Sequence, residues 1–395
     1  MPTPQKILID ARMAGTQNAG IGRSIEELIK NLISIDTENE YYIFLNKENF
    51  SLPDEWLNPK DEKRIHKILV DARWYTLKEQ FVLPKEIKKI KPDLVYFPHF
   101  NVPLFYRGKF IITIHDLIWI KYPRPRKEIS TLGPLLYGVK NFFSKIIFRF
   151  AVKRAQTIIA PTEFTKKDII EFCKINPEKI KVINWGIVLN PPSASWRTHL
   201  RKGGKLEKSD NCLKKCYNTN ELYFLYVGSA YPHKNLIFLL EVFKNINKIK
   251  PNFQFVLAGK DSYFYQKLKQ KAKELNLENK VIFTGYVSDE DLDLLYEKAF
   301  AFIFPSLLEG FGMPPLEAMR FGAPVLSSNS SCLPEIFGDA ALYFDPTNRK
   351  DLEEKILSII ENQDLREELI QKGFERVKKY DWQRCAEEYL EIIKT

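Results

Sequence analysis

The sequence predicts an α/β protein with two doubly wound, Rossmann-like domains, each a parallel sheet covered by helices on both faces. Three observations predict this class. The chain has 395 residues, too many for one ordinary domain, and its apolar content of 45% is enough for a full core. Short apolar segments alternate with amphipathic ones along most of the chain, as in sheets of parallel strands. A polar, lysine-rich stretch at 191–220 separates two such series and is expected to be a linker.

The first domain is expected at 1–190, with its first strand at residues 6–10. A glycine-bearing loop then runs to Arg23, and a helix follows near 24–35, where apolar residues recur with a period of 3.6. The further strands expected in this domain are 42–45, 68–70, 94–97, 110–114, 157–160 and 181–183.

The second domain is expected at 221–375. Its predicted strands are 223–227, 254–258, 280–284, 301–304 and 324–326, and the helices between them include 236–246, 263–275 and 289–298. Residues 376–395 predict a final helix, for which packing back on the first domain is one arrangement. In two doubly wound domains the carboxyl edges of the sheets, where ligands bind, are expected to face one another across a cleft.

The net charge of +10 is concentrated in residues 104–154, which hold eleven Lys or Arg against only Asp116 and Glu128. Aromatic and aliphatic residues are interspersed among these cations. Two interpretations stay open: a helix with an apolar core face and a solvated basic face, or a basic amphipathic surface that rests on anionic lipid. Nucleic acid is not expected, because no recognition motif accompanies the charge.

Cysteine usage and hydropathy indicate the compartment. The five cysteines are odd in number and scattered, which is typical of a reduced, cytoplasmic protein. No apolar run approaches the roughly 18–20 residues needed to span a bilayer, and the first residues lead directly into a strand. We therefore expect a cytoplasmic protein, with peripheral attachment to the inner face of the cell membrane as an option.

A metal site is not expected. Cys212 and Cys216 lie in a polar stretch without histidines that could complete a zinc site. Asp289, Asp291 and Asp293 have the spacing of a D-x-D motif, but they occupy a capped helix start and are interpreted as a solvated face.

The most informative segment is 301–324, where an apolar strand runs into a loop that carries Glu309, Gly310 and Gly312. A short helix is expected from Pro314 to Gly322, since proline suits the first turn of a helix and glycine its end. The backbone N–H groups at such a helix start bind phosphate well, and here they come mainly from Phe311, Gly312, Met313 and Leu316.

Two carboxylates flank these N–H groups. Glu309 and Glu317 are suited to accept hydrogen bonds from sugar hydroxyls next to a phosphate, a combination that suggests a nucleotide-sugar. For Glu317 a structural role is the alternative, because a carboxylate in the first turn of a helix is favoured by the helix dipole.

A second candidate site follows the strand at 223–227. Gly228 and Ser229 lie at its carboxyl end, and Lys234 and Asn235 precede the next helix. Lys234 is placed to neutralise a diphosphate leaving group, much as a metal ion would. The structural alternative is a solvent-facing lysine with Asn235 as a plain N-cap.

The first domain offers weaker candidates. Gly20, Gly22 and Arg23 lie in the loop after the first strand, but Ile25 occupies the position of the third glycine of a dinucleotide motif, so a nicotinamide cofactor is not expected. The glycines would let the backbone approach a sugar or phosphate. His115 ends the strand at 110–114, and His99 is a second candidate on the acceptor side; a buried structural histidine is the alternative for His115.

These residues resemble the retaining nucleotide-sugar glycosyltransferases of family 4, the glycosyl transferases group 1 with the GT-B fold. The resemblance rests on a Glu-x7-Glu motif from Glu309 to Glu317, on Gly228 with Lys234 and Asn235, on Gly285-Tyr286, and on Leu333-Pro334-Glu335. Gly20-Ile21-Gly22-Arg23 and His115-Asp116 resemble the mannosyltransferase-B-like branch.

The resemblance implies roles for these positions. Lys234 and the amides at Gly310, Phe311, Gly312 and Met313 would hold the donor diphosphate. Glu317 would accept hydrogen bonds from the ribose, Glu309 would face the transferred sugar, and the backbone near Tyr286 would hold the base. Gly22 and His115 would complete the site from the first domain. The resemblance also implies that the first domain binds the acceptor and the second the nucleotide-sugar. Many family members have arginine where this chain has Ser229, a difference for which Arg23 or His233 could compensate.

The function expected from the resemblance is transfer of a hexose, with mannose the leading choice, from a nucleotide diphosphate sugar. The acceptor is expected to be a glycan or lipid-linked glycan, the anomeric configuration to be retained, and no cofactor or metal to be needed. Catalytic roles fall to Glu309, His115 and Lys234. Two alternatives stay open: a GT-B nucleotide-sugar epimerase and a non-catalytic partner subunit.

Overall fold

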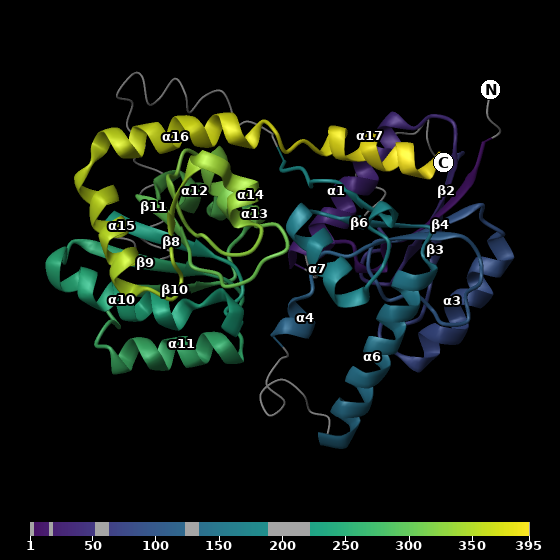
Figure 1. Cartoon of the computed structure of the whole chain (residues 1–395), viewed down its shortest axis with the longest axis horizontal. Helices are drawn as coiled ribbons and strands as arrows, with labels where there is room; N and C mark the ends of the chain where they lie inside the picture. Colours follow the sequence, from purple (N-terminus) through teal and green to yellow (C-terminus); the bar gives the residue numbers. More distant parts are fainter. Residues whose placement is uncertain (1–3, 16–18, 52–62, 123–133, 189–221, 395) are drawn as a thin grey trace. The chain divides into compact units, whose positions relative to one another are not determined.

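The computed structural model describes residues 4–15, 19–51, 63–122, 134–188 and 222–394. The chain divides into two compact units, which Figure 1 shows with their elements labelled. Unit 1 consists of Met1–Gly186 and Tyr380–Thr395, and unit 2 of Ile187–Lys379. The predicted linker at 191–220 lies outside the described residues, and so do Cys212 and Cys216.

Unit 1 contains a parallel sheet in the order β3-β2-β1-β4-β5-β6-β7. Its strands are β1 (Lys6–Asp10), β2 (Glu40–Leu45), β3 (Ile65–Leu69), β4 (Leu94–Phe97), β5 (Phe110–Thr113), β6 (Thr157–Ala160) and β7 (Ile180–Val182). Its helices are α1 (Ala19–Ile35), α3 (Leu77–Ile90), α4 (Ile118–Lys121), α6 (Pro134–Arg154), α7 (Glu163–Cys173) and α17 (Trp382–Ile393). Strand order reverses at β1, which pairs with β2 on one side and β4 on the other.

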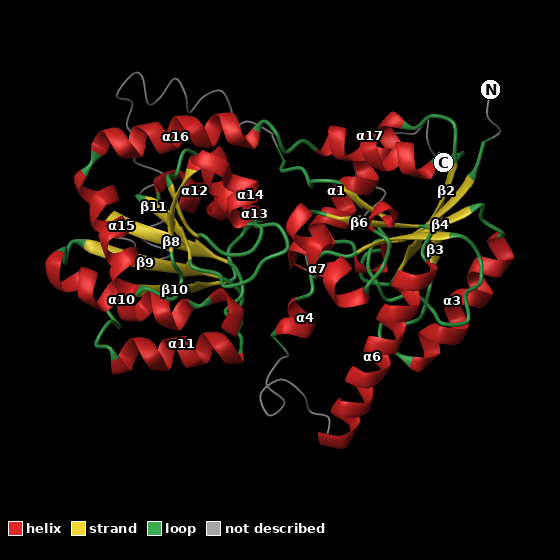
Figure 2. Cartoon of the chain, viewed as in Figure 1, coloured by secondary structure: helices red, strands yellow, loops and turns green. Residues whose placement is uncertain are grey.

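Unit 2 contains a second parallel sheet in the order β10-β9-β8-β11-β12-β13. Its strands are β8 (Leu222–Val227), β9 (Phe253–Ala258), β10 (Val281–Gly285), β11 (Ala301–Phe304), β12 (Val325–Ser328) and β13 (Ala341–Phe344). Its helices are α10 (Leu236–Ile249), α11 (Tyr263–Glu274), α12 (Asp289–Lys298), α13 (Met313–Arg320), α14 (Leu333–Phe337), α15 (Arg349–Glu361) and α16 (Gln363–Val377). In Figure 2 the strands lie between α10 and α11 on one side and α12 to α14 on the other.

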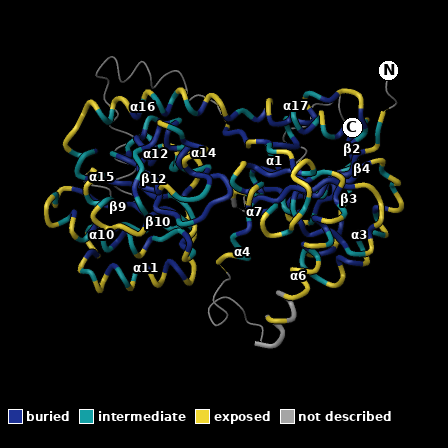
Figure 3. The backbone as a smooth tube through the Cα atoms, viewed as in Figure 1, coloured by how far each residue is buried: buried dark blue, intermediate teal, exposed yellow. Residues whose placement is uncertain are grey.

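The prediction of two doubly wound parallel sheets is confirmed, and most strand boundaries agree within two residues. The central strands are buried on both faces, as the dark tube in Figure 3 shows for each unit. A strand that is covered by helices on both faces of its sheet has no solvent-facing side for polar residues. This explains why β4 and β11 are continuous apolar runs.

The glycine loop expected before Arg23 is wrong. Helix α1 begins at Ala19, so Gly20, Gly22 and Arg23 lie in its first turns. Glycine is a poor helix former, but the amphipathic face of α1 buries Ile25, Leu28 and others against the core and against α17. Tertiary packing of this kind outweighs the roughly 1 kcal/mol preference against one glycine.

The C-terminal segment returns to unit 1. Helix α17 packs against α1, and the hydroxyl of Tyr389 lies 3.0 Å from Thr113 Oγ1 at the end of β5. The segment 376–395 is therefore split between the units, since α16 extends to Val377 in unit 2 and unit 1 resumes at Tyr380.

Helix α6, in the basic region at 104–154, has a buried part and an exposed part. Phe148, Ala151 and Val152 are buried in the core of unit 1. About a turn and a half before Phe148, the side chains of Phe142 and Phe143 are 63% and 51% exposed. The carboxyl half of α6 is thus a core helix, and the preceding part presents aromatic residues to solvent. No helix in the described parts of the chain is long and apolar enough to span a bilayer.

Candidate active site

The loop after β11 holds Glu309 in place. The strand is fully buried and ends at Phe304, and Pro305 then turns the chain into the loop. The Glu309 N–H donates to Ser331 Oγ at 3.1 Å, and its carbonyl oxygen accepts from Cys332 Sγ at 3.3 Å. Glu309 is only 7% exposed, so its carboxylate needs a partner of opposite charge.

Lys234 is that partner. Its Nζ lies 2.6 Å from Glu309 Oε1, and the two side chains are 15% and 9% exposed. Lys234 reaches this place because the short helix Pro232–Lys234 follows β8, the strand next to β11 in the sheet. The loops are also joined where the Leu307 N–H donates to the His233 carbonyl at 2.7 Å. Adjacent strands therefore deliver a charge pair to one sheet edge, and the solvent-facing lysine is excluded.

Asn235 does not act as a plain N-cap. It has a left-handed backbone, with φ of 59°, and its side chain makes no capping bond to α10. Its Nδ2 instead donates to the Pro346 carbonyl at 2.9 Å, which ties the end of this loop to the segment after β13.

The start of α13 presents backbone N–H groups as the sequence suggests. The helix begins at Met313, one residue before the predicted start, and Gly312 precedes it with φ of 99°. No side chain caps this N-terminus. Pro314 and Pro315 carry no N–H, so the donors of the first turn are few and belong to residues around Gly312. An anion would be favoured there by these groups and by the helix dipole.

Glu317 is not in the first turn of α13, which corrects the structural alternative for this residue. It is the fifth residue of the helix, and the first turn contains no acidic side chain. Its Oε2 accepts from the hydroxyl of Tyr296 in α12 at 2.8 Å, and Tyr296 is 1% exposed. A hydrogen bond to a buried tyrosine, and not the helix dipole, therefore orients Glu317.

Gly228 and Ser229 form a turn that two tyrosines hold. Gly228 has φ of 145°, and its carbonyl accepts from Tyr265 Oη at 2.8 Å. The Ser229 carbonyl accepts from Tyr226 Oη, also at 2.8 Å. Burial is the main cause that raises the pKa of both tyrosines, so they act as neutral donors. Tyr286, after Gly285, is 75% exposed at the end of β10, three strands along from β11.

The candidate residues of unit 1 form a separate group. His115 lies after β5 and is 7% exposed; its Nε2 bonds the Pro98 carbonyl at 2.7 Å. Its Nδ1 is buried and has no partner among the described residues. Burial lowers the pKa of His115 to about 4 and that of His99 to about 3, so both rings are neutral near pH 7. The structural alternative for His115 therefore holds for Nε2, whereas Nδ1 can still accept a hydrogen bond.

Sequence reasoning missed the residues that support the site. They are Ser331 and Cys332 behind Glu309, Tyr296 behind Glu317, and Tyr226 and Tyr265 behind the Gly228 turn. A tyrosine inside an apolar strand was a usable signal, because its hydroxyl needs a partner when buried. No such signal marks Ser331, whose role depends on the fold. Among the described residues, no group of three His, Cys, Asp or Glu side chains is placed to hold a metal.

Comparison with known proteins gives two family matches. Residues 19–190 match the family described as Glycosyltransferase Family 4, and residues 214–376 match Glycosyl transferases group 1. The O-antigen chain mannosyltransferase RfbU of Salmonella typhimurium is 28% identical over 81% of this chain and 78% of its own length. The O-antigen chain mannosyltransferase B of Escherichia coli is 34% identical over 44% of this chain. The aligned segment covers 45% of that relative, less than half of its length.

A solved structure shares the architecture. A glycosyltransferase from Rickettsia africae matches with a TM-score of 0.69 and 19% identity, covering 100% of this chain and 98% of its own. At this identity the likeness concerns the fold, two parallel-sheet α/β domains of the GT-B type.

Proposed function

Because the chain is a glycosyltransferase with a family 4 domain followed by a group 1 domain, we propose that it transfers a hexose, mannose as the leading choice, from a nucleotide diphosphate sugar to a glycan. The Lys234–Glu309 pair at the start of α13 is the observation that carries this proposal. Two relatives are named O-antigen chain mannosyltransferases, which supports mannose as the transferred sugar and a surface polysaccharide as the acceptor glycan.

The donor site follows from the charges in unit 2. A diphosphate at the α13 N-terminus lies beside Lys234 and competes with Glu309 for its ammonium group. Glu309 is then released to accept hydrogen bonds from the sugar, while Lys234 and the Gly312 amides stabilise the charge that develops on the leaving phosphate. Glu317, oriented by Tyr296, accepts from the ribose. Lys234 supplies the positive charge that a metal ion would otherwise bring.

The stereochemical course belongs to the proposal as well. The leaving phosphate oxygen accepts the proton of the attacking hydroxyl on the same face of the sugar, so the anomeric configuration is retained. The ring of His115 is neutral near pH 7, because burial lowers its pKa to about 4, and its Nε2 donates to the Pro98 carbonyl. Its Nδ1 therefore accepts a hydrogen bond from a sugar hydroxyl.

Two substitutions test the roles of the carboxylates. Glu317→Ala removes the ribose contact, and we expect nucleotide diphosphate to bind roughly 10-fold more weakly. Glu309→Ala removes a group that acts on the sugar, and we expect turnover to fall at least 100-fold while nucleotide affinity changes less. Calorimetry gives the affinities, and release of nucleotide in the presence of acceptor gives the turnover.

Glu290→Ala is the matched control, because Glu290 is an exposed carboxylate on α12 away from the loop. If Glu317→Ala bound nucleotide and turned over normally, Glu317 would serve only α12–α13 packing through Tyr296. Conversion of the nucleotide sugar into its epimer without acceptor and without net release of nucleotide would instead favour the epimerase.

The acceptor side of the proposal includes a membrane surface. Phe142, Phe143 and Ile146 on α6 are exposed, and the cations Lys145, Arg149 and Lys153 are exposed on the same helix. Aromatic side chains with flanking cations bind the interface of an anionic bilayer. We propose that this part of α6 rests on the inner face of the membrane, where a lipid-linked glycan is presented.

Sedimentation with vesicles tests the surface. We expect binding to vesicles that contain anionic lipid, loss of binding at high salt, and at least ~5-fold weaker binding after Phe142→Ser with Phe143→Ser. Ile249→Ser is the control, since Ile249 is 57% exposed on α10 of unit 2. If the double variant bound the vesicles as strongly as the wild type, this part of α6 would not be the membrane contact.

A further inference from the structure

Helix α3 of unit 1 begins with its polar and apolar side chains in reversed places. Glu79 and Gln80 are 0% and 7% exposed, whereas Leu77 and Phe81 are 81% and 64% exposed. A helix on the surface of a domain ordinarily turns its apolar side chains to the core and its charged ones to solvent. The folding of unit 1 therefore does not explain why Leu77 and Phe81 are apolar.

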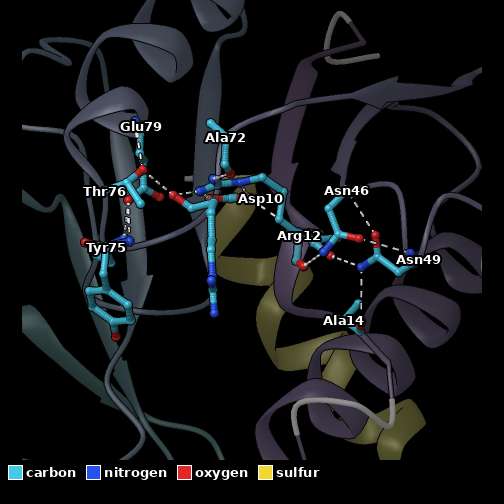
Figure 4. Close-up of polar contacts among 12 residues, drawn as sticks. Asp10, Arg12, Ala14, Asn46, Asn49, Ala72, Tyr75, Thr76 and Glu79 are labelled. Atoms are coloured by element: carbon cyan, nitrogen blue, oxygen red, sulfur yellow. Dashed lines mark hydrogen bonds and ion pairs between the residues drawn. The ribbon is translucent and has the colours of Figure 1, made fainter. Parts of the chain in front are cut away.

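Buried hydrogen bonds hold this reversed arrangement, as Figure 4 shows. Glu79 Oε1 accepts from Arg12 Nη2 at 2.6 Å, and its Oε2 accepts from the Tyr75 N–H at 2.8 Å. Arg12 is itself 2% exposed, so a rotation of α3 that buried Leu77 would separate two buried charges. That separation costs more than the burial of one leucine returns, and the apolar side chains stay outside.

The loop between β4 and β5 adds a third apolar side chain. The Leu104 N–H donates to Gln80 Oε1 at 2.8 Å, which holds this loop against α3. The ring centroid of Phe105 lies 5.2 Å from that of Phe81, although Phe105 is still 56% exposed. Leu77 lies one turn before Phe81 on the same face of the helix. We call Leu77, Phe81 and Phe105 the α3 patch.

The surroundings of the α3 patch are positively charged. Outside the core, residues 71–109 have three carboxylates, of which Asp71 pairs with Lys78 at 2.9 Å and Glu86 with Lys89 at 2.7 Å. The third is Asp93. The exposed cations of the same segment are Arg73, Lys78, Lys85, Lys88, Lys89, Lys91, Arg107 and Lys109. This excess of positive charge favours a partner that is apolar and negatively charged.

The loop that carries Phe105 also connects the α3 patch with α6. Arg107 lies over the ring of Phe150 at 5.9 Å, and Arg154 donates to the Arg107 carbonyl at 3.0 Å. Phe150 and Arg154 follow Phe143 by seven and eleven residues, so the three share one face of α6. The face of α6 that carries the exposed Phe143 therefore leads to the loop of the α3 patch.

We propose that the α3 patch is a second membrane contact of unit 1, in which its three apolar side chains enter the interface of an anionic bilayer. The inference rests on the proposed function, which places α6 on the same membrane, but it does not require transfer to occur. Apolar side chains among cations bind such an interface through buried area and through attraction to lipid phosphates. Lipid is favoured over a partner protein, because one bilayer covers both the α3 patch and the connected face of α6.

Sedimentation of the full chain with vesicles tests the α3 patch, using phosphatidylcholine alone and phosphatidylcholine mixed with phosphatidylglycerol. We expect binding to the mixed vesicles only, and at least ~5-fold weaker binding after Phe81→Ser with Phe105→Ser. Phe81→Leu with Phe105→Leu should retain most of the binding, because both side chains stay apolar. Leu222→Ser with Ile249→Ser is the matched control, since Leu222 and Ile249 are 55% and 57% exposed in unit 2.

Thermal unfolding of each variant shows whether it folds, and GDP affinity measured in the same samples reports unit 2. Equal vesicle binding by the folded serine variant and the wild type would overturn the inference, even if binding depended on Phe142 and Phe143. A dimer that is lost in the serine variant, with vesicle binding unchanged, would assign the patch to a second copy of the chain and overturn it as well.

The test also separates this inference from the transferase. Vesicle binding that depends on Phe81 and Phe105, in a chain without GDP affinity, would keep the membrane contact and remove the transferase. GDP affinity and transfer, with vesicle binding that does not depend on these side chains, would do the reverse.

Discussion

At the residue scale, the site of unit 2 depends on one ion pair whose charges are nearly buried. Removing one partner of such a pair costs more than the pair itself contributes, because the other charge stays behind without compensation. A nucleotide-sugar can offset that cost, because its diphosphate pairs with Lys234 while its sugar hydroxyls donate hydrogen bonds to the freed Glu309. The pairing of Lys234 with Glu309 therefore fits a site that exchanges an internal carboxylate for a diphosphate.

The buried histidines of unit 1 predict how stability depends on pH. The pKa of His115 is lowered to about 4 and that of His99 to about 3, mainly by burial. An unfolded histidine titrates near 6.5, so between these values the unfolded chain binds more protons than the folded one. Stability is therefore complete above about pH 6.5 and is lost as the pH falls, by about 2 kcal/mol per histidine at pH 5.

Urea unfolding at neutral pH and at about pH 5 measures this loss. His115→Asn keeps an amide N–H that can donate to the Pro98 carbonyl and removes one titrating group. Its stability should depend less on pH than that of the wild type. If the two proteins lost the same stability on acidification, the ring of His115 would not be held neutral by burial.

At the element scale, the start of α13 depends on glycine at one position. Gly312 has φ of 99°, and a Cβ there would lie 3.0 Å from Leu333 Cδ2 and from Phe337 Cζ. Gly312→Ala should therefore destabilise unit 2 by about 1–3 kcal/mol and shift the N–H groups of Phe311 and Met313. Hydrogen exchange, which reports each unit separately, measures the loss, and calorimetry measures nucleotide affinity.

Gly20→Ala is the opposite control. Gly20 lies in α1, and a Cβ there would meet no atom within 4 Å. Alanine is the better helix former, so this substitution should stabilise unit 1 by about 0.5–1 kcal/mol. A Gly312→Ala protein as stable as the wild type would show that the turn before α13 tolerates a side chain, and that its glycine is not required by the backbone.

The elements also show what sequence could predict. Some elements have the expected bounds, because each is a continuous apolar run or a helix with a clear cap. They are β1, β4, β6, β11 and α12. The start of α1 was missed because two glycines favour a loop locally, while the packing of α1 on α17, about 350 residues away in sequence, decides the outcome. β13 was not predicted: it is a short edge strand whose place depends on pairing with β12.

At the scale of the whole molecule, the site residues on loops at strand ends can be predicted from the sequence. The residues that hold these site residues by hydrogen bonds cannot. Glu309 and Lys234 follow buried strands, and the topology brings neighbouring strand ends together. Tyr296 behind Glu317 and Glu79 behind Arg12 come from elements distant in sequence, so only the fold shows them. The return of Tyr380–Thr395 to unit 1 likewise depends on tertiary packing.

The central claim is that unit 2 binds a nucleoside diphosphate through Lys234 and the amides at the start of α13. Calorimetric titration of the purified chain with GDP, UDP and ADP, without added metal, tests it most directly. The account predicts saturable binding with a preference for one base, GDP if the sugar is mannose, and loss of at least ~10-fold in affinity after Lys234→Met. Absence of binding by all three nucleotides, or full binding after Lys234→Met, would contradict it.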